Sequence, residues 1–86
     1  MTWTGQLGTL RGVPPRSTPD PALKRLGARI RSLREAKGWN QERLAGEAGI
    51  DRSYGHGLER GVRNITVLKL RQIAKALDVK MSAFFD

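Results

Sequence analysis

Basic side chains are the chemically active groups that dominate this sequence. Sixteen Lys and Arg residues oppose eight Asp and Glu residues, which gives a formal net charge of +8 and a sequence pI near 11.2. A domain pI above about 9 usually indicates a polyanionic partner. Nucleic acid is therefore the first candidate, ahead of an anionic membrane surface or an acidic protein. An excess of one charge that serves solubility alone is the alternative.

Groups that could catalyse a reaction or hold a metal ion are sparse. The chain has one histidine, His56, and no cysteine, so disulfides and thiolate metal sites are excluded. The acidic residues are scattered, whereas a hydrolytic or metal enzyme needs such groups clustered around one pocket. We therefore expect no enzymatic activity, no cofactor and no metal site. The lack of cysteine fits a cytoplasmic protein.

Length and hydropathy predict one small domain behind a leader segment. Eighty-six residues suffice for one domain with a modest core. The first ten residues lack a signal-peptide pattern, and no apolar run approaches the roughly 20 residues that span a bilayer. All four prolines precede residue 22, and residues 1–19 show no helical or strand period, so we expect a flexible arm there. The arm could enter a minor groove or have no role.

Helices must position the basic groups, because residues 20–86 show only helical patterns. Asp20 and Pro21 suit an N-cap and a first helical residue. Apolar residues recur at helical spacing over residues 21–37, at Leu26, Ile30 and Leu33. Gly38 is well placed as the C-cap of this helix.

Shorter helices are predicted in the rest of the chain. They cover residues 41–48, capped by Asn40, and residue 52 to about 59, capped by Asp51. Thr66 caps a fourth helix over residues 67–77, and Ser82 a last turn through Phe85. The expected buried stripe of the fourth helix is Val67, Leu70, Ile73, Ala74 and Leu77. The predicted fold is all-α, a compact bundle of about five short helices over residues 20–86.

Residues 40–60 contain two short helices separated by a glycine-containing turn, the signature of a helix-turn-helix. The second helix must lie close to the first so that it can project into a major groove about 12 Å wide. This geometry needs a small residue in the first helix, a glycine in the turn and apolar anchors. The sequence supplies Ala45, Gly49, Leu44, Ile50 and Leu58 for these places, and therefore predicts a DNA-binding unit.

Three segments carry a family resemblance: RIRSLREAKGWNQERLAGEAGIDRS, LERGVRN and LRQIAKALDV. In order and spacing they resemble the helix-turn-helix domain of the phage repressor and Cro family, also called the XRE family, over residues 26–85. Within it, DRSY, LERGVRNIT and a closing FF are most similar to the controller proteins of restriction–modification systems. The resemblance implies a lambda-repressor-like fold and a transcriptional regulator that binds a palindromic operator as a dimer.

The resemblance also implies which residues contact double-stranded DNA. Gln41 would grip a phosphate with its side chain and the helix N-terminus. Arg52 and Ser53 would face base edges, and arginine suits the O6 and N7 atoms of guanine. Further implied contacts are Tyr54 and His56 in the groove or at its wall, and Arg60, Arg63, Asn64 and Thr66 at the DNA backbone. Arg34 and Glu59 match a family pair, which predicts an ion pair.

Several of these residues have a plainer interpretation. Arg52 and Ser53 could be ordinary surface residues of a first helical turn. Tyr54 could cover the core instead of reaching DNA. His56 could be a solvated side chain or the neighbour of a phosphate, and Arg43 is interpreted as part of a solvated helix face.

Position 55 departs from the family, which usually has a bulky aliphatic residue there. Gly55 and Gly57 together cost the recognition helix about 2 kcal/mol of helix propensity, at ~1 kcal/mol each relative to alanine. Tyr54 or Leu58 could fill the space, or the helix could be only partly ordered without DNA. We expect Gly55→Val to raise the melting temperature if the site is a vacancy in the core.

A dimer is expected because one unit reads only about four or five base pairs, whereas a dimer places two recognition helices ~34 Å apart on a palindrome. The candidate interface is the C-terminal end of the helix 67–77 together with the segment MSAFF. Leu68 is a further candidate as an exposed apolar contact. RNA polymerase could touch Glu42 and Glu47, although a solvated helix face explains these acidic residues equally well.

Other classes of protein stay open at this point. An antitoxin would use the same fold and bind a toxin protein, and residues 1–19 are the only spare segment for that task. A phage-type repressor would share the whole motif. A membrane-surface helix would explain the basic first helix and not the turn motif.

Overall fold

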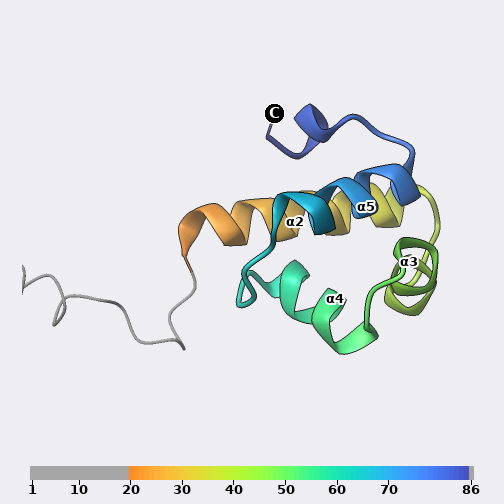
Figure 1. The fold of residues 1–86 in the computed structure, drawn as a ribbon, viewed down its shortest axis with the longest axis horizontal. Helices are drawn as coiled ribbons and strands as arrows, with labels where there is room; N and C mark the ends of the chain where they lie inside the picture. Colours follow the sequence, from red (N-terminus) through yellow and green to blue (C-terminus); the bar gives the residue numbers. More distant parts are fainter. Residues whose placement is uncertain (1–19, 86) are drawn as a thin grey trace, which may run out of the picture.

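The computed structural model describes residues 20–85, which form four α-helices and one 3-10 helix (Figure 1). The α-helices are α2 (Pro21–Ala36), α3 (Gln41–Ala48), α4 (Arg52–Arg60) and α5 (Val67–Leu77), and the 3-10 helix is η1 (Met81–Phe85). These residues contain no strand, so the prediction of an all-helical fold is confirmed. The expected count of about five helices is corrected, because the last one is a 3-10 turn. The predicted arm, residues 1–19, lies outside the described residues.

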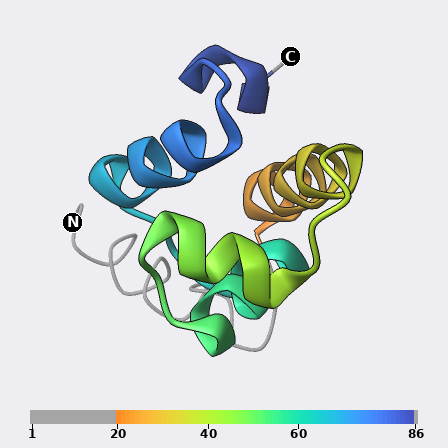
Figure 2. The same cartoon turned by 90° about the vertical axis from the view of Figure 1, so that its right-hand side faces the viewer.

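The core lies between α2 and α5. In the view of Figure 2, α3 and α4 cover it from below and η1 covers it from above. The helix α4 packs against α2 and α3, α3 also packs against α5, and η1 closes over α2 and α5. Ile30 and Ile73 are fully buried at the centre, 1% and 0% exposed. Burying such a side chain stabilises the fold by about 1.5–3 kcal/mol. The core therefore comes from the helical stripes that the sequence predicts.

Each α-helix begins at the predicted N-cap residue. Side-chain oxygens accept hydrogen bonds from backbone N–H groups of the first turn at four caps, Asp20 to Ala22 (2.8 Å), Asn40 to Arg43 (2.7 Å), Asp51 to Ser53 (3.0 Å) and Thr66 to Lys69 (3.1 Å). Such a cap contributes about 1 kcal/mol. Gly49 (φ 70°) and Gly61 (φ 79°) end α3 and α4 in the left-handed conformation that glycine adopts without a steric penalty.

Three local expectations are wrong. The C-cap of α2 is Lys37, and Gly38 follows it with φ 75°. Ser82 does not cap the last turn, because η1 already begins at Met81. Val67 is 71% exposed instead of buried. It is the first residue of α5, and side chains there point back past the helix N-terminus, away from the core that Leu70 and later residues reach.

The helix α4 is continuous through both of its glycines, and Gly55 has room for a side chain. A β-carbon on Gly55 would lie 3.4 Å from the δ-methyl group of Ile50, an ordinary contact, with nothing else within 4 Å. We expect Gly55→Ala to raise the free energy of unfolding by about 1 kcal/mol and the melting temperature by about 4–8 °C. Gly55→Val should raise it too, by extending the contact with Ile50. Thermal unfolding followed by circular dichroism measures both.

Gly38 provides the matched control for this prediction. It also has nothing within 4 Å of an added β-carbon, but its φ is 75°. Gly38→Ala should therefore lower the melting temperature, because the left-handed conformation costs an L-residue about 1–2 kcal/mol. An unchanged or lower melting temperature for Gly55→Ala would show that position 55 is not open space.

Candidate nucleic-acid interface

The turn between α3 and α4 is short and rigid. The backbone N–H of Ile50 donates to the carbonyl oxygen of Ala45 over 3.0 Å, across the left-handed Gly49. Ala45 is buried at 5% exposure, which lets α4 approach α3. Asp51 then starts α4 by accepting from the N–H groups of Ser53 and Tyr54. The predicted helix-turn-helix geometry is therefore present.

One face of α4 is exposed and basic. Arg52, His56 and Arg60 are all exposed, and residues four apart lie one above another on a helix. They form a stripe along α4, with the exposed Ser53 beside it. Leu58 faces the core at 4% exposure. The arrangement places two guanidinium groups and one imidazole on the outside of α4, the helix at the bottom of Figure 1.

A buried ion pair fixes α4 to α2. The guanidinium of Arg34 donates through Nε to Oε2 of Glu59 over 2.7 Å and through Nη2 to Oε1 over 3.0 Å. The side chains are only 9% and 3% exposed, and the predicted pair is confirmed. Arg34 also donates to the carbonyl oxygen of Trp39 over 2.7 Å. The hydrogen bond to Glu59 raises the pKa of Arg34 above its usual value, so the guanidinium stays charged.

Two predicted site residues extend this ion pair to the surface. Gln41 Nε2 donates to Glu59 Oε1 over 3.0 Å, and His56 Nδ1 lies 3.1 Å from Gln41 Oε1. Gln41 and Arg52 also line one shallow hollow of about 380 Å³, together with Arg34, Asn40 and Glu42. The side chain of Gln41, predicted to hold a phosphate, thus makes hydrogen bonds within the protein. The backbone at the start of α3 stays next to the hollow.

Other predicted residues meet at the first turn of α4. The hydroxyl of Tyr54 donates to the carbonyl oxygen of Asn64 over 3.0 Å, and the guanidinium carbon of Arg63 lies 6.0 Å from the centre of the Tyr54 ring. Tyr54 is half-buried and packs against the core. The structure therefore brings Arg63 and Asn64 beside the recognition helix. Thr66 lies just beyond them, with its hydroxyl committed to the cap of α5.

The comparisons with known proteins agree with this geometry. Residues 30–84 match the Helix-turn-helix family. The chain belongs to this family. The structure of the restriction–modification controller protein C.AhdI from Aeromonas hydrophila is similar at 46% identity and TM-score 0.72, over 73% of this chain and 96% of that chain.

Two further comparisons concern controller proteins. A tetramer of the controller protein C.Esp1396I on its natural 35 base-pair operator matches at 38% identity and TM-score 0.71, over 77% of this chain and 87% of that one. Control protein C.BamHI from Bacillus amyloliquefaciens is 36% identical over 70% of this chain and 75% of its own length. The predicted resemblance of this helix-turn-helix protein to the controller proteins is confirmed.

Sequence reasoning missed some residues of this helix-turn-helix protein. The contact of Gln41 with Glu59 and His56 joins residues on separate helices, and sequence spacing gives no signal for it. Gly27 allows the close crossing of α2 and α4, since a β-carbon there would lie 2.6 Å from the carbonyl oxygen of Glu59. A glycine inside an amphipathic helix often marks such an approach, so this signal was present.

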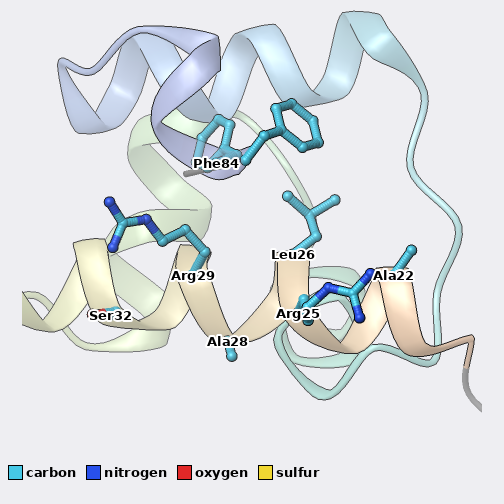
Figure 3. Close-up of a pocket in the computed structure, with 8 residues that line it drawn as sticks. Ala22, Arg25, Leu26, Ala28, Arg29, Ser32 and Phe84 are labelled. Atoms are coloured by element: carbon cyan, nitrogen blue, oxygen red, sulfur yellow. The ribbon is translucent and has the colours of Figure 1, made fainter.

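A groove lies on the opposite side of the molecule, between α2 and η1 (Figure 3). Its volume is about 550 Å³, and its lining comprises Ala22, Arg25, Leu26, Ala28, Arg29, Ser32, Phe84 and Phe85. Nε of Arg29 donates to the carbonyl oxygen of Ala83 over 2.7 Å, which ties η1 to α2.

Within residues 20–85, no helix is long and apolar enough to cross a membrane, and no cluster of His, Asp and Glu could hold a metal ion.

Proposed function

We propose that this protein is a transcriptional regulator that binds a palindromic DNA operator as a homodimer, with α4 in the major groove. The observation that carries the proposal is the exposed basic stripe of Arg52, His56 and Arg60 on a helix that the buried Arg34–Glu59 pair holds in place. A fixed helix with a basic face suits a major groove about 12 Å wide. The relatives are regulators, and C.Esp1396I was solved on its operator.

In this proposal, the residues that contact the bases lie in the first turn of α4. Arg52 and Ser53 are exposed in its first turn, and a guanidinium fits the O6 and N7 atoms of guanine. Residues at the edge of the helix contact phosphates and fix the register without reading sequence. This second group consists of the backbone of Gln41, the side chains of Tyr54, Arg60, Arg63 and Asn64, and the capped start of α5 at Thr66.

Arg52→Ala is expected to relax sequence preference, because it removes the side chain assigned to a guanine. One good bidentate contact is worth about 1–3 kcal/mol of discrimination, so preference at that base pair should fall at least fivefold. Selection of bound sequences from a random DNA pool, with wild type and variant in parallel, measures this. The wild-type pool should contain an inverted repeat. Unaltered preference in the variant would contradict the assignment.

Arg63→Ala is the matched comparison for a phosphate contact. It should weaken binding to all sequences alike and make the slope of log K against log salt less steep by about 0.9 for the one phosphate released. Titrations at several salt concentrations give this slope. A change in base preference with Arg63→Ala would show that Arg63 contacts a base instead of a phosphate.

The dimer is proposed to form through the end of the molecule that carries η1. Phe85 is 68% exposed beside the groove of Figure 3, while Phe84 is buried at 4%. Leu68 on α5 is also exposed, at 63%, as predicted. Exposed large apolar side chains of this kind mark contact surfaces. Because η1 lies on the far side of α2 from α4 (Figures 1 and 2), pairing there leaves both recognition helices free.

Phe85→Asp is expected to shift the protein from dimer to monomer. The substitution places a charge in the proposed apolar interface and leaves the buried Phe84 in place, so the fold should persist. Sedimentation velocity gives the oligomeric state, and circular dichroism checks the helices. Arg43→Ala, on an exposed face of α3, serves as the control. A variant that remains dimeric would place the interface elsewhere.

The target genes are proposed to be those of a restriction–modification system, with both activation and repression at the protein's own promoter. An activator could touch RNA polymerase through the exposed Glu42, whereas Glu47 already pairs with Arg43 over 2.9 Å. Transcription in vitro from a promoter that carries the selected operator tests this role at increasing protein concentration. Repression alone at every concentration would favour a phage-type repressor, and co-purification with a toxin protein would favour an antitoxin.

A further inference from the structure

We propose that His56 is a specificity-determining residue whose unprotonated Nε2 accepts a hydrogen bond from the exocyclic amino group of a cytosine or adenine. This inference rests on the proposed function, because α4 must lie in the major groove. The residues that carry it form a chain of hydrogen bonds from the buried Arg34–Glu59 pair to the exposed face of α4.

The buried ion pair first fixes the orientation of the Gln41 amide. Glu59 forms a two-point ion pair with Arg34, with N–O distances of 2.7 and 3.0 Å, and the carboxylate of an ion pair has only acceptor atoms. The Gln41 atom 3.0 Å from Glu59 Oε1 must therefore be its NH₂ group. The carbonyl oxygen of Gln41 is then turned toward His56.

The fixed amide in turn selects one form of the imidazole ring. Gln41 Oε1 lies 3.1 Å from His56 Nδ1, and this oxygen can only accept, so Nδ1 must carry the proton. A neutral imidazole has a single ring proton, so in the neutral form of His56 the atom Nε2 is an acceptor without a proton. A metal-binding imidazole is often fixed by a similar partner on its other nitrogen.

Hydrogen-bond donors flank His56 along α4. Arg52 and Arg60 lie one turn away on either side along α4, and both guanidiniums only donate. Glu42 on α3 lines one hollow together with Arg52, and Arg34 on α2 is paired with Glu59.

His56 is the acceptor between two donors on the exposed face. In the major groove the base-edge donors are N4 of cytosine and N6 of adenine. The half-site should therefore place one of these bases next to the guanine that Arg52 reads.

The tautomer can be measured without DNA. Long-range proton–nitrogen NMR spectra of ¹⁵N-labelled protein at mildly alkaline pH report which ring nitrogen carries the proton. We expect mainly the Nδ1–H form in the wild type and in the control Arg43→Ala, and a smaller fraction of it in Gln41→Leu. The same spectra show whether each variant is folded. A folded wild-type protein with mainly Nε2–H would overturn the inference.

The base preference is measured by selection from a random DNA pool with His56→Ala and His56→Asn. The asparagine amide can still donate to Gln41 Oε1 but has no atom where Nε2 lies. Both variants should lose about five- to tenfold of the preference for cytosine or adenine at one half-site position, which is typical of one hydrogen bond. Preference for guanine opposite Arg52 should persist.

The outcomes separate this inference from the proposed function. If the wild type selects an inverted repeat and both His56 variants keep its full base preference, His56 does not read a base and only the inference fails. If the wild type selects no sequence at all, the proposed function fails and the base contact fails with it, whatever tautomer the NMR spectra show.

Discussion

Glu59→Gln is expected to lower the free energy of unfolding by about 3–5 kcal/mol, because it leaves the buried Arg34 charge with only the exposed carboxylate of Glu35, 4.0 Å away, as a counter-ion. The carboxylate accepts two hydrogen bonds from Arg34 and one from Gln41, and its side chain is 3% exposed. A small domain has roughly 5–15 kcal/mol of stability in total. Chemical denaturation, with the transition midpoint and slope compared with those of the wild type, measures the loss.

Glu47→Gln is the matched control, since it removes the same charge at the surface of α3. Glu47 pairs with Arg43 over 2.9 Å, and the two side chains are 46% and 57% exposed. An exposed pair four residues apart on a helix contributes about 0.3–0.5 kcal/mol. If Glu59→Gln cost no more than Glu47→Gln, the ion pair would not be what holds α4 to α2.

The same substitution should also weaken DNA binding beyond its effect on stability. Glu59 orients Gln41, and Gln41 contacts His56 on the exposed face of α4. A partial rescue by a second substitution, Arg34→Met, would fit this account, because removing both partners avoids an uncompensated buried charge. Stability should recover in that double variant more than the orientation of His56 does.

Gly27→Ala should be as damaging, although it adds one methyl group to a helix. The new β-carbon would lie 2.6 Å from the carbonyl oxygen of Glu59 and in collision with that of Leu58. Both obstacles are backbone atoms of α4, which cannot rotate away as a side chain can. Overpacking costs typically 1–3 kcal/mol and occasionally more, so we expect a loss of about 3 kcal/mol despite the gain in helix propensity.

Gly46→Ala isolates the effect of the added methyl group itself. Gly46 lies in α3, is exposed, and has nothing within 4 Å of an added β-carbon. The free energy of unfolding should rise by about 1 kcal/mol, the propensity difference between the two residues. Thermal and chemical unfolding of both variants give the comparison. A Gly27→Ala variant as stable as Gly46→Ala would mean that α2 and α4 separate at no cost.

Much of the candidate site follows from sequence because its signals are local. The N-caps Asp20, Asn40, Asp51 and Thr66 hydrogen-bond to residues two or three positions away, and the bounds of α3 match the prediction. The Arg34–Glu59 pair was predicted from the family resemblance, although 25 residues separate its partners. DNA contacts of individual residues stay a prediction, since they involve a partner that the sequence does not contain.

The sequence by itself determined the four α-helices, their N-caps, the turn between α3 and α4, and the basic face of α4, because each depends on neighbouring residues and on helical periodicity. Only the tertiary structure decided how those helices meet. It showed that Gly27 gives α4 the room to approach α2, that Val67 faces solvent, and that Gln41 connects Glu59 to His56. These features depend on distances between residues far apart in the chain, for which a single sequence has no periodic signal.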